Sequence, residues 1–138
     1  MEICCQPKRL LRVAEYQAHY EAYSPDTDLI KELKKIIEPT TVLLVFGYWC
    51  HDSERIVPEI VKALEVADNS QIQMLAVHVT YNETDPSPFM AGPIPVKRYP
   101  TVAFLSGHFK TLDEIPADTT PWLIFAEHSL TAANFSKW

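Results

Sequence analysis

The sequence predicts an α/β protein with a mixed central sheet and an N-terminal helical extension, and three observations predict it. Apolar runs at 41–46 and 72–80 flank a segment of helical period, which is the strand, helix, strand order of a right-handed parallel crossover. Shorter runs at 101–105 and 109–114 meet at a serine–glycine pair and indicate an antiparallel hairpin. Helical patterns also occupy most of the first 39 residues.

The helical extension is predicted from two segments. Alanine and leucine recur at helical spacing across 8–23, and the stretch SPDTD at 24–28 then offers capping residues and a proline suited to a helix start. The second helix, predicted over 28–38, places apolar residues on one side and lysines on the other. Pro39 is expected to end it.

The crossover begins with the run TVLLVF at 41–46, whose continuous apolar character is typical of a strand buried on both faces. An apolar stripe of helical period follows across 53–67, and Pro58 inside it is expected to kink the helix. The run IQMLAVHVT at 72–80 is the next predicted strand.

The second half of the chain is predicted less uniformly. A proline-rich connection spans 82–97, with a short helical turn expected around 87–91. The hairpin strands at 101–105 and 109–114 are joined at Ser106-Gly107, and a last helix is predicted over 120–130.

Composition limits the classes of function. A chain of 138 residues is expected to form one domain with its own core. Twelve basic against eighteen acidic residues give a net charge of −6, which argues against a nucleic-acid partner and an anionic membrane surface. No apolar run is long enough to span a bilayer, and the N-terminus lacks the apolar core of a signal peptide, so a cytoplasmic location is expected. Three cysteines are a poor basis for a disulfide framework.

The stretch GYWCHDSERIVPEI at 47–60 carries the main functional signal. A Trp-Cys pair stands between a strand and its helix, Pro58 follows Cys50 by eight residues, and RYPTVAFL at 98–105 looks like a cis-proline segment leading into a buried strand. These features resemble the thioredoxin fold over about residues 41–130, and small bacterial thioredoxin-family proteins in particular. The resemblance implies a three-layer α/β/α domain with its core at 40–131 and a helical extension at 1–39.

The departures from that family are equally specific. The motif Cys-His-Asp-Ser has Ser53 where the family carries its resolving cysteine, and Leu44 stands where thioredoxins carry a buried aspartate. The glycine expected after the last strand is replaced near Pro116. The resemblance therefore implies a single-thiol protein rather than a standard dithiol reductase.

Cys50 and Ser53 are the candidate catalytic residues. A cysteine at a helix N-terminus meets unpaired backbone N–H groups and the positive end of the helix dipole, which favour the thiolate. The alternative is a buried, unreactive thiol. Ser53 has three interpretations: a hydrogen-bond donor to the thiolate, a plain N-cap, or a relic of lost activity. A hydroxyl cannot attack a mixed disulfide as a thiolate does, so release of a bound partner would need an outside thiol.

Five further residues are candidates for substrate binding. His51 would favour the thiolate when protonated, whereas the charge of Asp52 would oppose it or would simply complement the helix dipole. The resemblance predicts that Pro100 is cis and that the Tyr99 backbone lies beside Cys50, where it would pair with an extended substrate. Trp49 and Tyr99 would then form an apolar rim, although Tyr99 could instead just cover the hairpin.

Other chemistry is less well supported by the pattern. Cys4 and Cys5 could supply a resolving thiol or could be surface residues without a role. No metal site is predicted, because Cys50, His51, Asp52, His78 and His108 lack ligand spacing, and no cofactor is expected. The monothiol glutaredoxins share C-x-x-S, but the preceding tryptophan and the missing Gly-Gly turn argue against that class.

The sequence thus predicts a monothiol protein in thiol–disulfide exchange, of the isomerase or deglutathionylation type, with a protein disulfide or glutathione as partner. The alternative is a peptide-binding module that has lost redox turnover.

Overall fold

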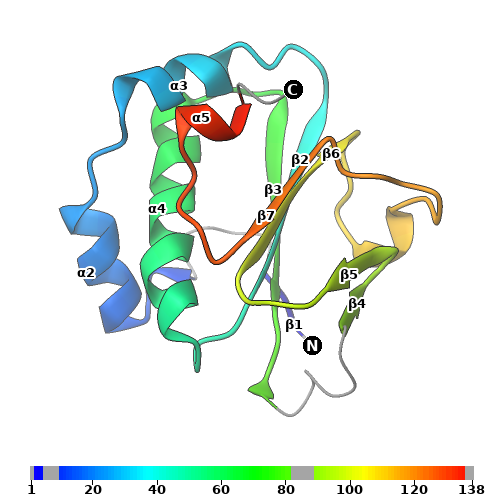
Figure 1. Cartoon of the computed structure of the whole chain (residues 1–138), viewed down its shortest axis with the longest axis horizontal. Helices are drawn as coiled ribbons and strands as arrows, with labels where there is room; N and C mark the ends of the chain where they lie inside the picture. Colours follow the sequence, from blue (N-terminus) through cyan, green and yellow to red (C-terminus); the bar gives the residue numbers. More distant parts are fainter. Residues whose placement is uncertain (1, 5–9, 82–88, 136–138) are drawn as a thin grey trace.

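Figure 1 shows a computed structural model of the chain, which describes residues 2–4, 10–81 and 89–135. The centre is a five-stranded sheet of order β1-β3-β2-β6-β7, in which only β2 and β3 run parallel. The strands are β1 (Glu2–Cys4), β2 (Thr40–Phe46), β3 (Ile72–His78), β6 (Thr101–Ser106) and β7 (Leu123–Ala126). The predicted mixed sheet and its parallel crossover are therefore confirmed.

Every residue of β2 is buried, because this strand has neighbours on both sides and side chains pack on both of its faces. Its alternate residues divide the interior in two. Val42, Leu44 and Phe46 face one hydrophobic core, and Leu43 and Val45 face the other.

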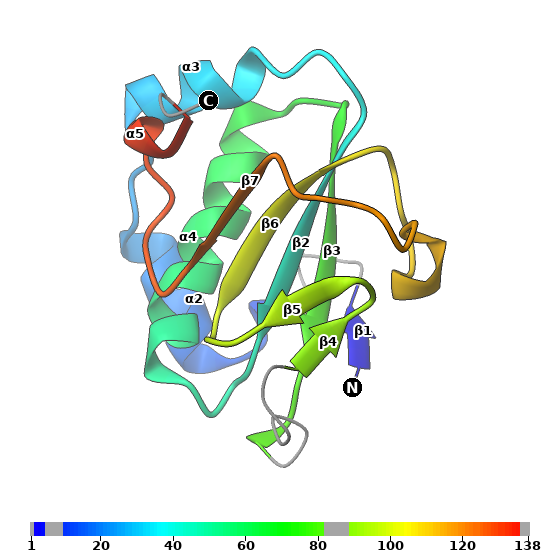
Figure 2. The same ribbon diagram turned by 45° about the vertical axis from the view of Figure 1, so that its right-hand side comes forward.

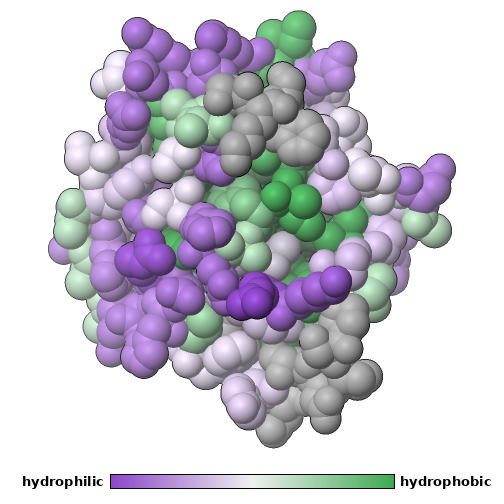
Figure 3. All heavy atoms as spheres, viewed as in Figure 1, coloured by the Kyte–Doolittle hydropathy of each residue, from purple (hydrophilic) through white to green (hydrophobic). Residues whose placement is uncertain are grey.

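Helices cover the first of these faces. They are α2 (Ala14–Ala22), α3 (Thr27–Lys34), α4 (His51–Ala67) and α5 (Ala132–Phe135), and Figure 1 shows all four on the same side of the sheet. The longest, α4, contributes a stripe of buried residues including Ile56, Ile60 and Val61. Figure 3 shows hydrophilic side chains over α2 and the start of α4, whereas apolar side chains reach the surface over β7, where Ile124 is exposed.

The opposite face departs from the predicted three-layer α/β/α arrangement. Among the described residues, no α-helix covers it. The hairpin of β4 (Phe89–Ala91) and β5 (Ile94–Val96) does so instead, together with the 3-10 turn η2 (Leu112–Glu114) (Figure 2). Proline-rich sequence cannot supply helical N–H groups, and the positive φ of Gly92 turns the chain into a tight hairpin. The helical turn expected around 87–91 is thus wrong for 89–91, and 87–88 lie outside the described residues.

Two further predictions in this half are wrong. The segment 109–114 does not form the second hairpin strand, because Thr111 and Glu114 make a capping box that closes η2. The helix predicted over 120–130 is replaced by β7, which pairs antiparallel with β6. Pairing with an otherwise open sheet edge overrode the local helical pattern there.

The N-terminal extension is not wholly helical either. β1 pairs antiparallel with β3, so residues 2–4 form an edge of the central sheet. The helix predicted over 8–23 is shorter, with α2 beginning at Ala14, and residues 8 and 9 lie outside the described part.

The helix predicted over 28–38 ends at Lys34, where the Asn69 side chain donates to the carbonyls of Leu33 and Ile36 at 2.9 and 2.8 Å. Within the described residues, no helix has the length and apolarity needed to cross a membrane.

Candidate functional site

Cys50 lies at the N-terminus of α4, at the end of the short loop that follows β2. Its backbone is extended, and its carbonyl accepts the first helical hydrogen bond, from the Glu54 N–H at 3.1 Å, which makes Cys50 itself the N-cap. The preceding turn is closed by the Cys50 N–H, which donates to the Gly47 carbonyl at 3.1 Å. The side chain is half-buried, so the sulfur is neither sealed in the core nor fully exposed.

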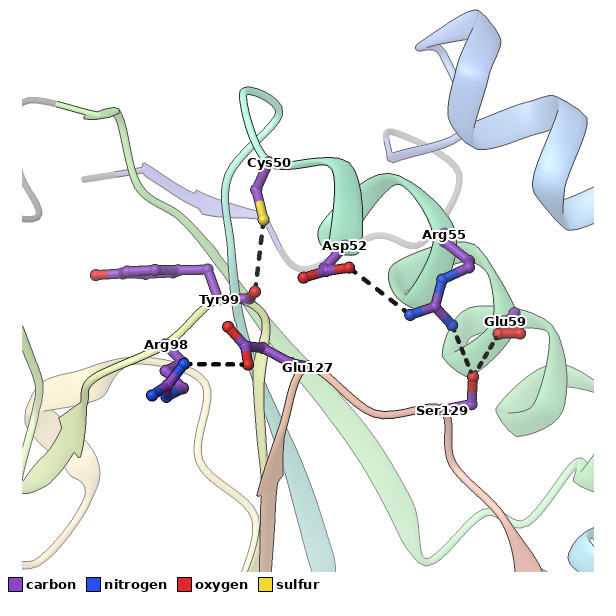
Figure 4. Close-up of polar contacts among 8 residues, drawn as sticks. All are labelled: Cys50, Asp52, Arg55, Glu59, Arg98, Tyr99, Glu127 and Ser129. Carbon is purple, nitrogen blue, oxygen red and sulfur yellow. Dashed lines mark hydrogen bonds and ion pairs between the residues drawn. The ribbon is translucent and has the colours of Figure 1, made fainter.

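The sulfur contacts the backbone of Tyr99. Its Sγ donates to the Tyr99 carbonyl oxygen at 3.4 Å, and Figure 4 shows that oxygen pointing directly at the sulfur. The Tyr99–Pro100 peptide bond is cis, as predicted, and Pro100 is buried. The predicted proximity of Tyr99 and Cys50 is therefore present.

A pocket of about 430 Å³ opens around this contact. Its lining residues come from three parts of the chain, namely Trp49, Cys50, Asp52, Lys97, Arg98, Tyr99 and Glu127. Four of these were predicted site residues. Lys97, Arg98 and Glu127 were not predicted.

Glu127 reaches the pocket because β7 lies beside β6. Its N–H donates to the Pro100 carbonyl at 3.1 Å, its φ of 63° lies in the left-handed region, and its carboxylate pairs with Arg98 at 3.4 Å. Glu127 fell inside a predicted helix, so no sequence signal marked it. Lys97 and Arg98 directly precede Tyr99 and could have been found by that adjacency.

Trp49 forms one wall of the site. Its indole N–H donates to the Val79 carbonyl at 2.9 Å, and its ring meets Tyr99 and Tyr81 edge to face, each at 5.4 Å between centroids. A β-carbon at Gly47 would lie 2.4 Å from the indole, so any larger residue there would displace the Trp49 ring. With 39% of Trp49 exposed, the predicted apolar rim of Trp49 and Tyr99 is present, and Tyr81 extends it.

Of the three interpretations of Ser53, the structure excludes the N-cap, because Cys50 holds that position. Ser53 lies inside α4 and is fully buried, and its hydroxyl accepts a hydrogen bond from the Gly47 N–H at 3.4 Å. The hydroxyl therefore supports the loop before Cys50 rather than starting the helix.

His51 and Asp52 both lie close to charged side chains in the first turn of α4. The His51 side chain is 99% exposed and its Nδ1 lies 3.8 Å from Glu54, pointing to solvent. Asp52 lies 3.8 Å from Arg55, whose guanidinium donates to Ser129, which in turn donates to Glu59 (Figure 4). This chain of contacts ties the segment after β7 to α4.

The pocket around the sulfur is not lined by His78, His108 or Leu44. Within the described part of the chain, no group of three or more His, Cys, Asp or Glu side chains could hold a metal ion. His78 packs on Tyr48, and His108 contacts the Gln71 carbonyl. The backbone of Cys4 pairs opposite Ala76 in the sheet, and Cys5 lies outside the described residues. Leu44 is fully buried among the helices, so no carboxylate stands at that point.

No family model and no curated protein matches the chain. Two solved structures are similar to it. A protein of unknown function from Pseudomonas aeruginosa has 15% identity and a TM-score of 0.55, over 88% of this chain and 70% of its own. An HIV epitope scaffold has 14% identity and a TM-score of 0.53, over 84% of this chain and 66% of its own. At such low identity these likenesses concern the fold alone.

Proposed function

We propose that the chain has a thioredoxin-like fold and takes part in thiol–disulfide exchange through Cys50. The crossover of β2, α4 and β3, with a cysteine between strand and helix, supports the fold, as does an antiparallel β6 whose preceding proline segment lies beside the sulfur. The hairpin in place of a second helical layer and the four-residue α5 are departures from it.

The observation that carries the proposal is the position of the Cys50 sulfur. It is half-buried, lines an open pocket, and stands where the unpaired N–H groups of α4 and the positive end of its dipole favour a thiolate. A thiolate with access to a partner is the reactive form of cysteine. An inert structural cysteine would be sealed inside the core.

The exchange would proceed in two balanced steps. The Cys50 thiolate attacks one sulfur of a partner disulfide, a new S–S bond forms, and the other partner sulfur leaves as a thiolate. A second thiol, such as glutathione, then attacks the mixed disulfide and restores Cys50. No net oxidation of the protein occurs, which suits isomerisation or deglutathionylation.

Ser53 limits this chemistry to a monothiol cycle. Its hydroxyl is buried against the Gly47 amide and cannot displace a bound partner as a thiolate would. The mixed disulfide should therefore persist until an outside thiol arrives.

The second candidate is a peptide-binding module without turnover. The aromatic wall of Trp49, Tyr81 and Tyr99 favours it, because Trp49 and Tyr81 are exposed beside the Tyr99 carbonyl, and such a surface suits an extended peptide. In that case the sulfur need not react at all.

Mass spectrometry after incubation with oxidised glutathione separates the two functions. We expect a single glutathione adduct on native Cys50, which reduced glutathione removes and Cys50→Ser abolishes. An adduct on the unfolded but not on the native protein would mean that the thiol is shielded, which favours the binding module. If Cys4→Ser combined with Cys5→Ser accumulates far more adduct than the native protein, those cysteines resolve the disulfide and the monothiol cycle is wrong.

A further inference from the structure

The pocket beside Cys50 contains charged side chains of both signs. Asp52 and Glu127 carry negative charges, and Lys97 and Arg98 carry positive charges, so the pocket is balanced although the whole chain has a net charge of −6. At physiological ionic strength the Debye length is about 8 Å, and more distant surface charges are largely screened. The side chains of the pocket therefore decide which charge a bound partner meets.

Three of these charges already have a partner within the protein. Asp52 lies 3.8 Å from the guanidinium of Arg55, and the carboxylate of Glu127 lies 3.4 Å from the guanidinium of Arg98 (Figure 4). Lys97, in contrast, forms no ion pair with any residue of the part of the chain that the structure describes. The pocket thus presents one positive charge that the described residues do not compensate.

The backbone on both sides of Lys97 is held in place. Val96, the last residue of β5, is buried directly before it. Directly after it, the carbonyl of Arg98 accepts a hydrogen bond from the Thr101 hydroxyl at 2.6 Å. The Lys97 side chain itself is exposed, so its ammonium is accessible to a partner from solvent. The chain therefore fixes where this side chain begins and leaves its charged end available.

Partners of opposite charge would meet this pocket differently. A lysine ammonium is a compact charge with three hydrogen-bond donors, which suits a carboxylate. A partner's carboxylate could contact Lys97 directly, whereas it would have to displace Glu127 in order to reach Arg98. A cationic partner would be repelled by Lys97 and would find both carboxylates of the pocket already paired. The arrangement favours an acidic partner.

We propose that Lys97 is the specificity-determining residue of this pocket, and that it selects partners with a carboxylate close to their disulfide. This inference rests on the proposed exchange function of Cys50. The carboxylate could belong to glutathione or to an acidic residue beside the cysteine of a protein disulfide. The exchange step itself is unchanged: Cys50 bonds to one partner sulfur and the other leaves as a thiolate, while Lys97 contacts the carboxylate and transfers no proton.

The test measures the rate of mixed-disulfide formation at Cys50 with acidic and neutral disulfides, with Cys4→Ser and Cys5→Ser in every sample. One pair is oxidised glutathione and 2-hydroxyethyl disulfide. The other pair is two blocked peptide disulfides with either glutamate or glutamine beside the cysteine. The readout is the ratio of the acidic to the neutral rate, because a general effect of Lys97 on the sulfur would change both rates by the same factor.

Lys97→Gln should lower this ratio about two- to fivefold in at least one pair, which is the size expected for the loss of one exposed ion pair. The pair that responds identifies the source of the carboxylate. Glu127→Gln should raise the ratio in the same pair, because it releases Arg98 to contact the carboxylate as well. Opposite shifts in the two variants would support the inference.

Lys31→Gln is the matched control, because it removes the same charge far from the pocket. Lys31 is exposed on α3, and the C-terminal end of α3 contacts Asn69, which follows the C-terminus of α4. Cys50 lies at the other end of this 17-residue helix, which is about 25 Å long. The ratio for Lys31→Gln should equal that of the parent.

Three outcomes would overturn the inference. An unchanged ratio in both pairs for Lys97→Gln would show that the ammonium does not contact the partner. An equal fall in Lys31→Gln would show that only the net charge matters, and a fall in Glu127→Gln would contradict the competition for Arg98. Failure of the proposed function looks different, because folded Cys50 would then react with neither member of either pair, in the parent as in the variants.

Discussion

The sulfur of Cys50 lies between two backbone features. Cys50 is the N-cap of α4, and its thiol donates a hydrogen bond to the Tyr99 carbonyl at 3.4 Å. A substrate that engages the Tyr99 carbonyl would release the thiol from that hydrogen bond. Binding and activation of the sulfur would then be coupled through one oxygen atom.

Restoring the missing sulfur is the first prediction. Ser53 lies one helical turn after Cys50, so Ser53→Cys should recreate a pair that can close a disulfide. Reductase turnover of insulin should rise severalfold over the native protein, but incompletely, because Leu44 offers no carboxylate to move the proton. Ser53→Ala, which adds no thiol, should stay as slow as the native protein. Equal rates for the two variants would contradict the monothiol account.

The second residue-scale prediction concerns alkaline pH. Because folding raises the pKa of Tyr16, the unfolded chain loses this proton first as pH rises above about 10, and stability falls there. The slope contributed by this one group is about 1.4 kcal/mol per pH unit. Urea unfolding between pH 9 and roughly 11 should show a shallower decline in Tyr16→Phe than in the native protein. Parallel declines would mean that Tyr16 ionises freely in the fold.

At the scale of elements, α4 positions the site. Particular residues define the N-terminus and the C-terminus of this helix. Its start at Cys50 was predictable because a buried strand, a short loop and a helical stripe follow one another. Its last residue is Ala67, and Asp68 then adopts a φ of 47° while its N–H donates to the Leu64 carbonyl at 3.1 Å. Glycine is the residue that this conformation favours.

Replacing that residue is the third prediction. Asp68→Gly should stabilise the protein by about 0.5–1 kcal/mol, because glycine adopts the left-handed conformation without steric cost. Asp68→Ala should destabilise it, because alanine adds the β-carbon clash without the polar side chain that aspartate can use locally. Urea denaturation of both variants measures the difference. Equal stabilities would show that the left-handed conformation does not limit α4.

The elements that could not be predicted from the sequence are the strands that form by pairing with an edge of the central sheet. The strand β7 has a pattern that also suits a helix, and it became a strand because β6 offered an open edge. β1 is too short to leave a periodic signal, yet it pairs with β3. Local propensity favours an element, but a sheet edge elsewhere in the chain can override it.

At the scale of the whole molecule, the sheet separates two hydrophobic cores, one on each of its faces. The helices cover one face, and the β4–β5 hairpin with η2 covers the other. The candidate site lies at the end of the sheet where β2, the segment before β6 and the end of β7 meet. The proximity of Cys50 and Tyr99 could be predicted from their sequence motifs. Glu127 reaches the site only because of the strand order β2-β6-β7.

The fourth prediction tests whether the hairpin belongs to the same cooperative unit. Ile94 on β5 is buried, so Ile94→Ala should cost about 2–4 kcal/mol in a single urea transition. Met90 on β4 is 51% exposed, so Met90→Ala should change stability by less than about 0.5 kcal/mol. Similar small effects from both would mean that the hairpin contributes little to this core.

The most direct test of the central claim is the second-order rate constant of Cys50 with oxidised glutathione. It should be measured with Cys4→Ser and Cys5→Ser in place, so that Cys50 is the sole thiol among the three cysteines of the chain. If the fold activates this sulfur, the folded protein should react severalfold faster than the same protein unfolded in urea at the same pH. A folded protein that reacts no faster than the unfolded chain would contradict the exchange function and leave the peptide-binding module in its place.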